Sequence, residues 1–167
     1  MKILETERLI LRPLQTDDAD FMFELMNEPA FIRNVADRGI RNRALAAAYI
    51  TEKILPSYAN FNFGFYRVDL KETSSPIGMC GLVKRDTLED VDVGFSILER
   101  FWGNGYAFEA ASAMMEYGRT HLGLARIVGV TAPGNLASIR LLEKLGLKFQ
   151  RKIDLPGFGA AESLLFG

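Results

Sequence analysis

Two glycines, Gly103 and Gly105, separate a strand-like segment from a long helix-like segment, and this junction constrains the fold more than any other feature. Residues 90–97 alternate polar and apolar side chains, as a half-buried strand does. Glycine lets the backbone turn tightly and approach a ligand closely. The first N–H groups of a helix have no partner within it, and the helix dipole favours an anion there. The junction therefore predicts a phosphate or pyrophosphate site, to which Arg100 adds positive charge.

The remaining hydrophobic patterns predict the element order β-αα-βββ-α-β-α-ββ. The expected strands cover residues 8–14, 61–70, 77–84, 90–97, 126–131, 147–153 and 162–166. The expected helices cover residues 16–27, 42–55, 106–122 and 136–145. Short turns join the strands between residues 61 and 97, which indicates an antiparallel meander. We expect residues 1–167 to form a single α/β domain, with one mixed sheet and helices on both of its faces.

Composition excludes several classes of protein. The 20 basic and 21 acidic residues give a net charge of -1, which provides no electrostatic footprint for nucleic acid or an anionic membrane. No apolar run approaches 18 residues, and the N-terminus lacks the apolar core of a signal peptide. One cysteine, Cys80, forms no internal disulfide, so we expect a buried thiol and a cytoplasmic location. With one histidine and one cysteine, we expect no metal site of the usual spacing.

Neither common nucleotide-binding motif fits the glycine junction. A P-loop needs Gly-Lys followed by Ser or Thr, which the chain lacks. A dinucleotide-binding fold needs a third glycine where this chain has Phe108. It also needs an acidic residue near the end of the next strand, but residues 126–134 contain none. A nucleotide-binding protein is therefore disfavoured, although Gly-x-Gly alone is a weak motif.

Three ordered blocks resemble the GNAT superfamily of N-acetyltransferases. Residues 100–107 read Arg-x-x-Gly-x-Gly-x-Ala, which looks like the acyl-CoA loop of that superfamily. Residues 135–147, with Asn135 and Ser138, resemble its second CoA-contacting motif. Residues 6–14, Thr-Glu-Arg-Leu-Ile-Leu-Arg-Pro-Leu, resemble the RimJ/RimL-like branch, which acetylates the N-termini of ribosomal proteins.

The resemblance implies a GNAT fold in which the two central strands splay apart and pantetheine lies between them like an extra strand. Acetyl-CoA is then the cosubstrate, and no metal is required. The implied cofactor-binding residues are Phe95, Ser96, Ile97, Arg100, Trp102, Gly103, Asn104, Gly105, Tyr106, Ala107, Asn135 and Ser138. The peptide groups of residues 95–97 would bond the pantetheine amides, and the loop from Arg100 to Ala107 would hold the pyrophosphate. For Trp102 and Tyr106, packing of the loop is the alternative role.

The resemblance also suggests two catalytic residues. Asp92 occupies the strand position where relatives often carry Glu, and it would accept the amine proton directly or through a water. Glu89 and Asp90 are weaker candidates, because they fall in the turn. Many relatives protonate the leaving thiolate with a Tyr, but this chain has Leu142 there, which leaves Ser138 as the candidate. A solvent-facing strand carboxylate and a helix-capping serine are the alternative roles.

The acceptor is open at this level. A protein N-terminal α-amine and a small-molecule amine are both compatible with the sequence, and so is a non-catalytic module that only binds acyl-CoA. By family analogy, we expect the acceptor to enter near Phe31, Asn34 and the loop at residues 156–159. The protein is expected to be a monomer or a homodimer.

Overall fold

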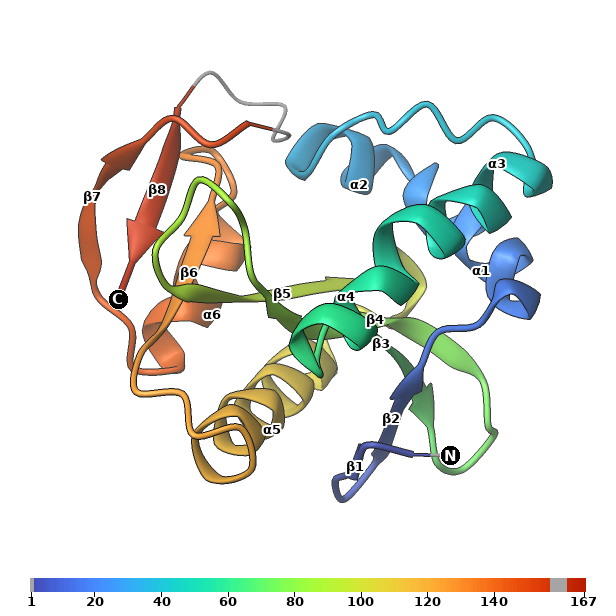
Figure 1. Cartoon of the computed structure of the whole chain (residues 1–167), viewed down its shortest axis with the longest axis horizontal. Coiled ribbons are helices and arrows are strands. Elements are labelled where there is room, and N and C mark those ends of the chain that lie inside the picture. The colour runs from blue at the N-terminus through green and yellow to red at the C-terminus, as the bar shows by residue number, and fades with distance from the viewer. Residues whose placement is uncertain (1, 157–161) are drawn as a thin grey trace.

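The computed structural model describes residues 2–156 and 162–167, which form one mixed sheet in the order β1-β2-β3-β4-β5-β6-β8-β7 (Figure 1). All neighbouring strands pair antiparallel except β5 and β6, which pair parallel. The strands are β1 (Leu4–Glu5), β2 (Leu9–Pro13), β3 (Phe65–Leu70), β4 (Pro76–Val83), β5 (Val91–Ile97), β6 (Ile127–Thr131), β7 (Phe149–Ile153) and β8 (Ser163–Phe166). The predicted meander is β3-β4-β5.

Helices cover both faces of the sheet, as the sequence predicts (Figure 1). They are α1 (Ala19–Met26), α2 (Pro29–Asn34), α3 (Arg43–Tyr49), α4 (Leu55–Phe61), α5 (Tyr106–Thr120) and α6 (Leu136–Lys144). Small residues of α5, including Ala110 and Ala111, pack in one core cluster with Val93 of β5. On the other face, α1 and α3 pack against Met79 of β4. No helix in the described ranges is long and apolar enough to cross a membrane.

Pro29 and Pro56 follow the expected helices at residues 16–27 and 42–55, and each lies at the start of another helix in the structure. Pro29 lies in the first turn of α2, a helix that was not predicted. Pro56 lies in the first turn of α4, and a π-helical segment (Ile50–Ile54) joins α4 to α3. Proline is tolerated there because its missing N–H would have no partner within the helix. The expected strand over residues 61–70 is correspondingly wrong at its start, because α4 continues to Phe61.

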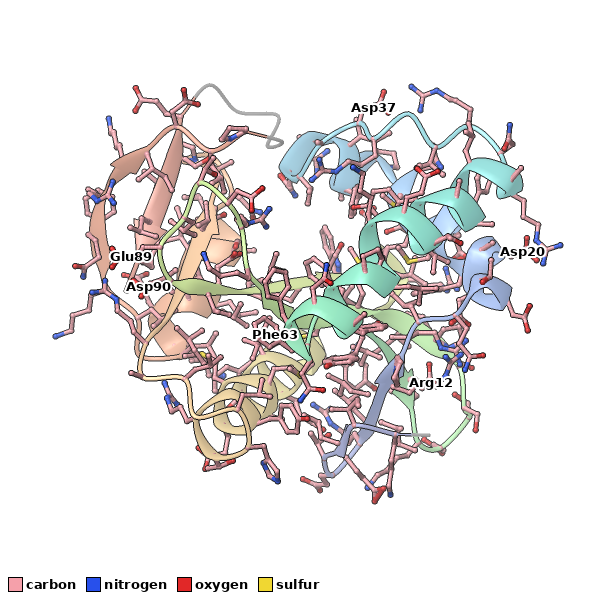
Figure 2. All side chains as sticks on the ribbon, viewed as in Figure 1. Arg12, Asp20, Asp37, Phe63, Glu89 and Asp90 are labelled. Atoms are coloured by element: carbon pink, nitrogen blue, oxygen red, sulfur yellow. The ribbon has the colours of Figure 1, made fainter. Side chains whose placement is uncertain are left out.

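A cluster of buried ion pairs fixes the segment before α1 to the sheet. Arg12 of β2 and Arg67 of β3 each place a guanidinium nitrogen 2.8 Å from Asp18 Oδ1. Burial tends to raise the pKa of Asp18, but the hydrogen bonds from Arg12 and from the Gln15 N–H outweigh it, so the pKa is lowered. Arg12 lies well away from the turn that carries Glu89 and Asp90 (Figure 2). This cluster therefore holds the fold together and is remote from that part of the sheet.

Strands β5 and β6 separate after a short contact. They pair only at Val91 with Ile127 and at Asp92 with Val128. Beyond that point β6 continues along β8, whereas β5 continues along β4. The predicted splay of the central strands is confirmed, and it leaves one edge of β5 open from Val93 onward.

Candidate active site

The open edge of β5 borders a cavity of about 680 Å³. One side is formed by Phe95, Ser96 and Ile97 of β5. The loop before α5 and the first turn of α5 form the second side, and α6 forms the third. Residues lining these two sides are Trp102, Gly103, Gly105, Tyr106, Ala107, Phe108, Asn135, Ser138, Arg140 and Lys144. The structure thus brings most of the predicted cofactor residues to one cavity. Phe108, Arg140 and Lys144 line it too, although they were not among the predicted residues.

The register of β5 against β4 determines which peptide groups point toward this cavity. The Leu98 N–H donates to the Ile77 carbonyl at 2.8 Å, and Ser96 lies opposite Met79. Because peptide groups alternate along an antiparallel strand, those of Ser96 point to β4 and those of Phe95 and Ile97 point away from it. The expected pairing of all three residues 95–97 with a ligand is therefore corrected to Phe95 and Ile97.

The N-terminus of α5 has the geometry expected of an anion site. Gly103 and Gly105 both adopt φ of +80°, a left-handed conformation that favours glycine. Helix α5 begins without a side-chain cap, and the Glu109 N–H makes the first intrahelical bond, to the Gly105 carbonyl at 3.0 Å. The N–H groups of Tyr106, Ala107 and Phe108 precede that bond, so they are the donors that a phosphate would meet.

The acid in the first turn of α5 does not oppose an anion at this site. The Glu109 carboxylate accepts from the Thr6 hydroxyl at 2.5 Å and from Arg8 Nε at 2.7 Å. Burial tends to raise the pKa of Glu109, but these bonds lower it. The guanidinium of Arg8 also lies 4.5 Å from the centre of the Tyr106 ring. The block at residues 6–14 therefore neutralises Glu109 and supports the start of α5.

Three loop residues contribute differently from one another. Trp102 lines the cavity with 48% of its surface exposed, and its Nε1 donates to the Ile97 carbonyl at 2.7 Å. The amide of Asn104 donates to the carbonyls of Phe101 and Trp102 at 3.0 and 3.2 Å, which stabilises the loop itself. Arg100 forms an ion pair with Glu24 of α1 and does not line the cavity, so the structure does not bring its charge to the predicted place.

At the start of α6, Asn135 and Ser138 lie together. The Asn135 side-chain oxygen accepts from the Ser138 N–H at 3.2 Å and so caps the helix. The helix is therefore capped by the Asn135 side chain and not, as the alternative role of Ser138 had it, by the Ser138 hydroxyl. The cap engages the amide oxygen of Asn135 and leaves its NH₂ group as the donor toward the cavity.

A second cavity of about 720 Å³ adjoins the first at Asn135 and Ser138. Both cavities are lined by Phe95, Ser96, Asn135 and Ser138. Phe31 and Asn34, which were expected at the acceptor entrance, line both cavities as well. Residues 157–159 of the expected entrance loop lie outside the described residues. The two cavities therefore meet at the open part of β5, where two bound molecules would come into contact.

Asp92 lies in the wall of the second cavity with only 2% of its surface exposed. Arg85 Nε donates to its Oδ1 at 2.9 Å. Burial raises the pKa of Asp92, and the charge and hydrogen bond of Arg85 act against that rise. Glu89 and Asp90 line neither cavity, so they are not brought to the site. Cys80 is buried, as predicted, and burial raises the pKa of its thiol.

Basic side chains in the second cavity outnumber acidic ones. The basic residues are Arg38, Lys53, Lys84 and Arg85, and the acidic residues are Glu52, Asp86 and Asp92. Lys84 Nζ is engaged by the carbonyls of Leu88 and Arg85 at 2.6 and 3.0 Å. Within residues 2–156 and 162–167, no group of three or more His, Cys, Asp or Glu side chains is placed to hold a metal ion.

Comparison with known proteins agrees with this geometry. Residues 8–148 match the family model described as acetyltransferase (GNAT) domain. The uncharacterized N-acetyltransferase p20 of Bacillus licheniformis is 30% identical over 169 residues, covering 99% of this chain and 92% of that protein. The acetyltransferase of Agrobacterium tumefaciens has a TM-score of 0.79 at 26% identity, covering 98% and 91% of the two chains.

A third likeness is one of fold alone. The ribosomal L7/L12 alpha-N-protein acetyltransferase RimL, solved in complex with coenzyme A, has a TM-score of 0.83 at 14% identity. The match covers 99% of this chain and 96% of that one.

Proposed function

The chain belongs to the GNAT acetyltransferase family, and on that premise we propose that it transfers the acetyl group of acetyl-CoA to the α-amine of a protein N-terminus. An acetyl-transferring enzyme of this family needs a site for the acyl donor and a separate approach for the amine. The observation that carries the proposal is the open edge of β5, which lies beside the uncapped start of α5 and between the two cavities.

The first cavity suits acetyl-CoA, whose diphosphate and pantetheine amides need different partners. The N–H groups at the start of α5 suit the diphosphate. The peptide groups of Phe95 and Ile97 suit the pantetheine amides, as in addition of a strand to a sheet edge. The Ile97 carbonyl already accepts a hydrogen bond from Trp102 Nε1. The N–H and carbonyl of Phe95 are therefore the more accessible pair for pantetheine.

Direct transfer requires a neutral amine, because an ammonium ion has no lone pair. The amine nitrogen forms a bond to the thioester carbonyl carbon, the carbon–sulfur bond breaks, and the amine proton passes to a base. We assign Asp92 as that base, acting through a water, because its pKa is raised by burial and it lies in the acceptor cavity. Arg85 would hold the Asp92 carboxylate in one orientation.

Backbone N–H groups of β5 and the Ser138 hydroxyl would stabilise the negative charges that develop during transfer. The N–H groups of Val93 and Phe95 both point away from β4. Because the Phe95 peptide groups are assigned to the pantetheine amides, the Val93 N–H is the donor that remains for the developing oxyanion. Ser138 lies where both cavities meet, and its hydroxyl can donate to the departing thiolate. With these assignments, side chains and peptide groups of this chain would accept the proton, bind the oxyanion and donate to the thiolate, and no metal ion is needed.

A small-molecule amine is the second candidate acceptor. The volume of the second cavity, about 720 Å³, lies within the range of small-molecule pockets. A protein N-terminus is favoured by the fold likeness to the RimL enzyme, together with the matching block at residues 6–14. Among small-molecule amines, a polyamine is disfavoured, because basic side chains outnumber acidic ones in this cavity and would repel its several positive charges.

Release of free thiol from acetyl-CoA tests the proposal. Pools of peptides beginning with Ser, Ala, Thr and Met would be compared with polyamines, aminoglycosides and free amino acids. We expect release with peptides and none after their α-amines are blocked. Release with small amines alone would assign the second candidate. No release from any pool, with retained binding of acetyl-CoA, would indicate a non-catalytic acyl-CoA-binding module.

The pH dependence of the active pool tests Asp92. If Asp92 is the base, the wild-type kcat/KM rises with pH through the pKa of that carboxyl, and Asp92→Asn removes this limb. An unchanged pH profile in Asp92→Asn would exclude it as the base.

A further inference from the structure

We infer that Arg140 and Lys144 of α6 form a binding site for the 3′-phosphate of coenzyme A, so that the enzyme distinguishes acetyl-CoA from its 3′-dephospho form. The inference rests on the proposed function, since it takes acetyl-CoA to occupy the first cavity. It concerns two residues of the block at residues 135–147 that were not among the predicted cofactor-binding residues.

Both side chains lie on the wall of the first cavity. They are four residues apart on α6, so they project from the same side of the helix. Lys144 Nζ lies 4.2 Å from the centre of the Phe108 ring, and Phe108 lines the cavity too. This cation–π contact keeps the ammonium group at the cavity wall. The result is a pair of positive charges facing a space that also adjoins the start of α5.

The other cations near the start of α5 are occupied by acids. Arg8 is paired with Glu109, and Arg100 is paired with Glu24. In the part of the chain that the structure describes, Arg140 and Lys144 form no ion pair with an Asp or Glu side chain. An unneutralised pair of cations on a cavity wall is suited to a doubly charged anion such as a phosphate monoester.

The position of the pair follows the order of groups in coenzyme A. The ribose that carries the 3′-phosphate comes directly after the diphosphate, which we place at the N–H groups of the first turn of α5. The contact between Lys144 and Phe108 shows that the last turn of α6 lies beside that first turn of α5. Ser138, at the acyl end of the cavity, precedes Lys144 by six residues, or about 9 Å along the helix axis. The basic pair therefore lies at the outer end, where the ribose phosphate would emerge.

Arg33 is a third cation on the cavity wall, and it provides the competing explanation. It belongs to α2, which lies apart from α6 in the fold (Figure 1). Among the residues that the structure describes, no contact joins Arg33 to the first turn of α5 as the Phe108 contact joins Lys144 to it. Arg33→Gln is accordingly the comparison variant within the cavity. Arg119→Gln, in the last turn of α5, removes an equal charge at the opposite end of that helix.

Isothermal titration calorimetry with coenzyme A and with 3′-dephospho-coenzyme A tests the inference. We expect the wild type to bind coenzyme A about tenfold more tightly, because two exposed charge pairs contribute modestly. The ratio should fall to within about twofold in R140Q/K144Q, and it should persist in R33Q and R119Q. The wild-type ratio should also fall as the salt concentration rises. Thermal unfolding of each variant would show that the fold is retained.

Three results would overturn the inference. Equal binding of both compounds by the wild type would remove the 3′-phosphate site while leaving the proposed function intact. Discrimination that survives in R140Q/K144Q but is lost in R33Q would place the site on α2. Failure of the wild type to bind either compound would overturn the proposed function, and this inference with it.

Discussion

Replacing Arg85 by Met should make the stability of the protein strongly dependent on pH. The Asp92 carboxylate has 2% of its surface exposed, and Arg85 Nε is its partner at 2.9 Å. Met has a similar length but no charge, so the carboxylate would remain buried without its cation. A buried unpaired carboxylate takes up a proton, because burial disfavours the charged form.

The magnitude follows from the free energy of that protonation. The ordinary pKa of Asp92 is 3.8. Keeping such a group protonated costs about 1.4 kcal/mol for each pH unit above its pKa, hence about 4 kcal/mol at pH 7. A raised pKa in the folded state gives stability that is complete below the unfolded pKa and is lost as pH rises toward the folded pKa. We therefore expect Arg85→Met to be destabilised by about 3 kcal/mol more at pH 7 than at pH 5.

Urea unfolding at pH 5, 6 and 7 measures this difference. Arg85 has further interactions, and their loss would lower the stability equally at each pH. The change in the free energy of unfolding with pH therefore reports on Asp92 alone. In the double variant R85M/D92N the carboxylate is absent, and the slope should disappear. A destabilisation of R85M that is equal at pH 5 and pH 7 would refute the reasoning, because it would show that the Asp92 carboxylate is solvated in the fold.

Three further predictions concern residues of the candidate site, one of them with a control substitution. Ser138→Ala should lower kcat about tenfold in the thiol-release assay with little change in the KM for acetyl-CoA, and an unchanged kcat would remove its role. Gly105→Ala and Gly123→Ala should each lose about 1–2 kcal/mol in urea unfolding, because both residues adopt positive φ. Only Gly105→Ala should also weaken the binding of acetyl-CoA in calorimetry, and equal weakening would contradict the anion site. Asn135→Ala should lose about 1 kcal/mol of stability with the helix cap, whereas no loss would show that the cap contributes nothing.

Local signals in the sequence were sufficient for most of the fold. The glycines at positions 103 and 105 predicted the turn before α5, and both adopt the left-handed conformation. A helix was expected to begin at residue 42, and the Asn42 side chain caps α3 by accepting from the Leu45 N–H at 2.8 Å. Pro29 and Pro56 were misjudged, because proline is compatible both with the end of one helix and with the first turn of the next. Which role applies depends on the packing of the following residues, and this is not a local property.

The site was less predictable than the fold, since it depends on contacts between distant segments. Arg100 was expected at the anion site, but its partner Glu24 is 76 positions earlier in the chain, and no local pattern reveals that pairing. Arg85 could have been anticipated: it follows β4 by two residues, and Val83 lies opposite Asp92 in the β4–β5 hairpin. Arg140 and Lys144 are four residues apart and so share a helical face, a spacing visible in the sequence once the motif is placed on α6.

One strand organises both substrate sites, and the alternation along it explains how. The odd-numbered residues of β5, such as Val93, direct their side chains to the α5 core and their peptide groups to the open edge. The even-numbered residues bond β4 through their peptide groups. Their side chains lie on the opposite face of the sheet from those of the odd-numbered residues, and Asp92 lines the second cavity there. Between Asp92 and Ser96, a Cβ at Gly94 would lie 2.8 Å from the Phe65 ring, so this position has no room for a side chain. A shift of register by one residue would exchange the two sets, turning Asp92 toward α5 and removing the open peptide groups from Phe95. The pairing of β5 with β4 therefore determines the position of both the proposed base and the proposed donor edge, so neither can be changed independently of the sheet.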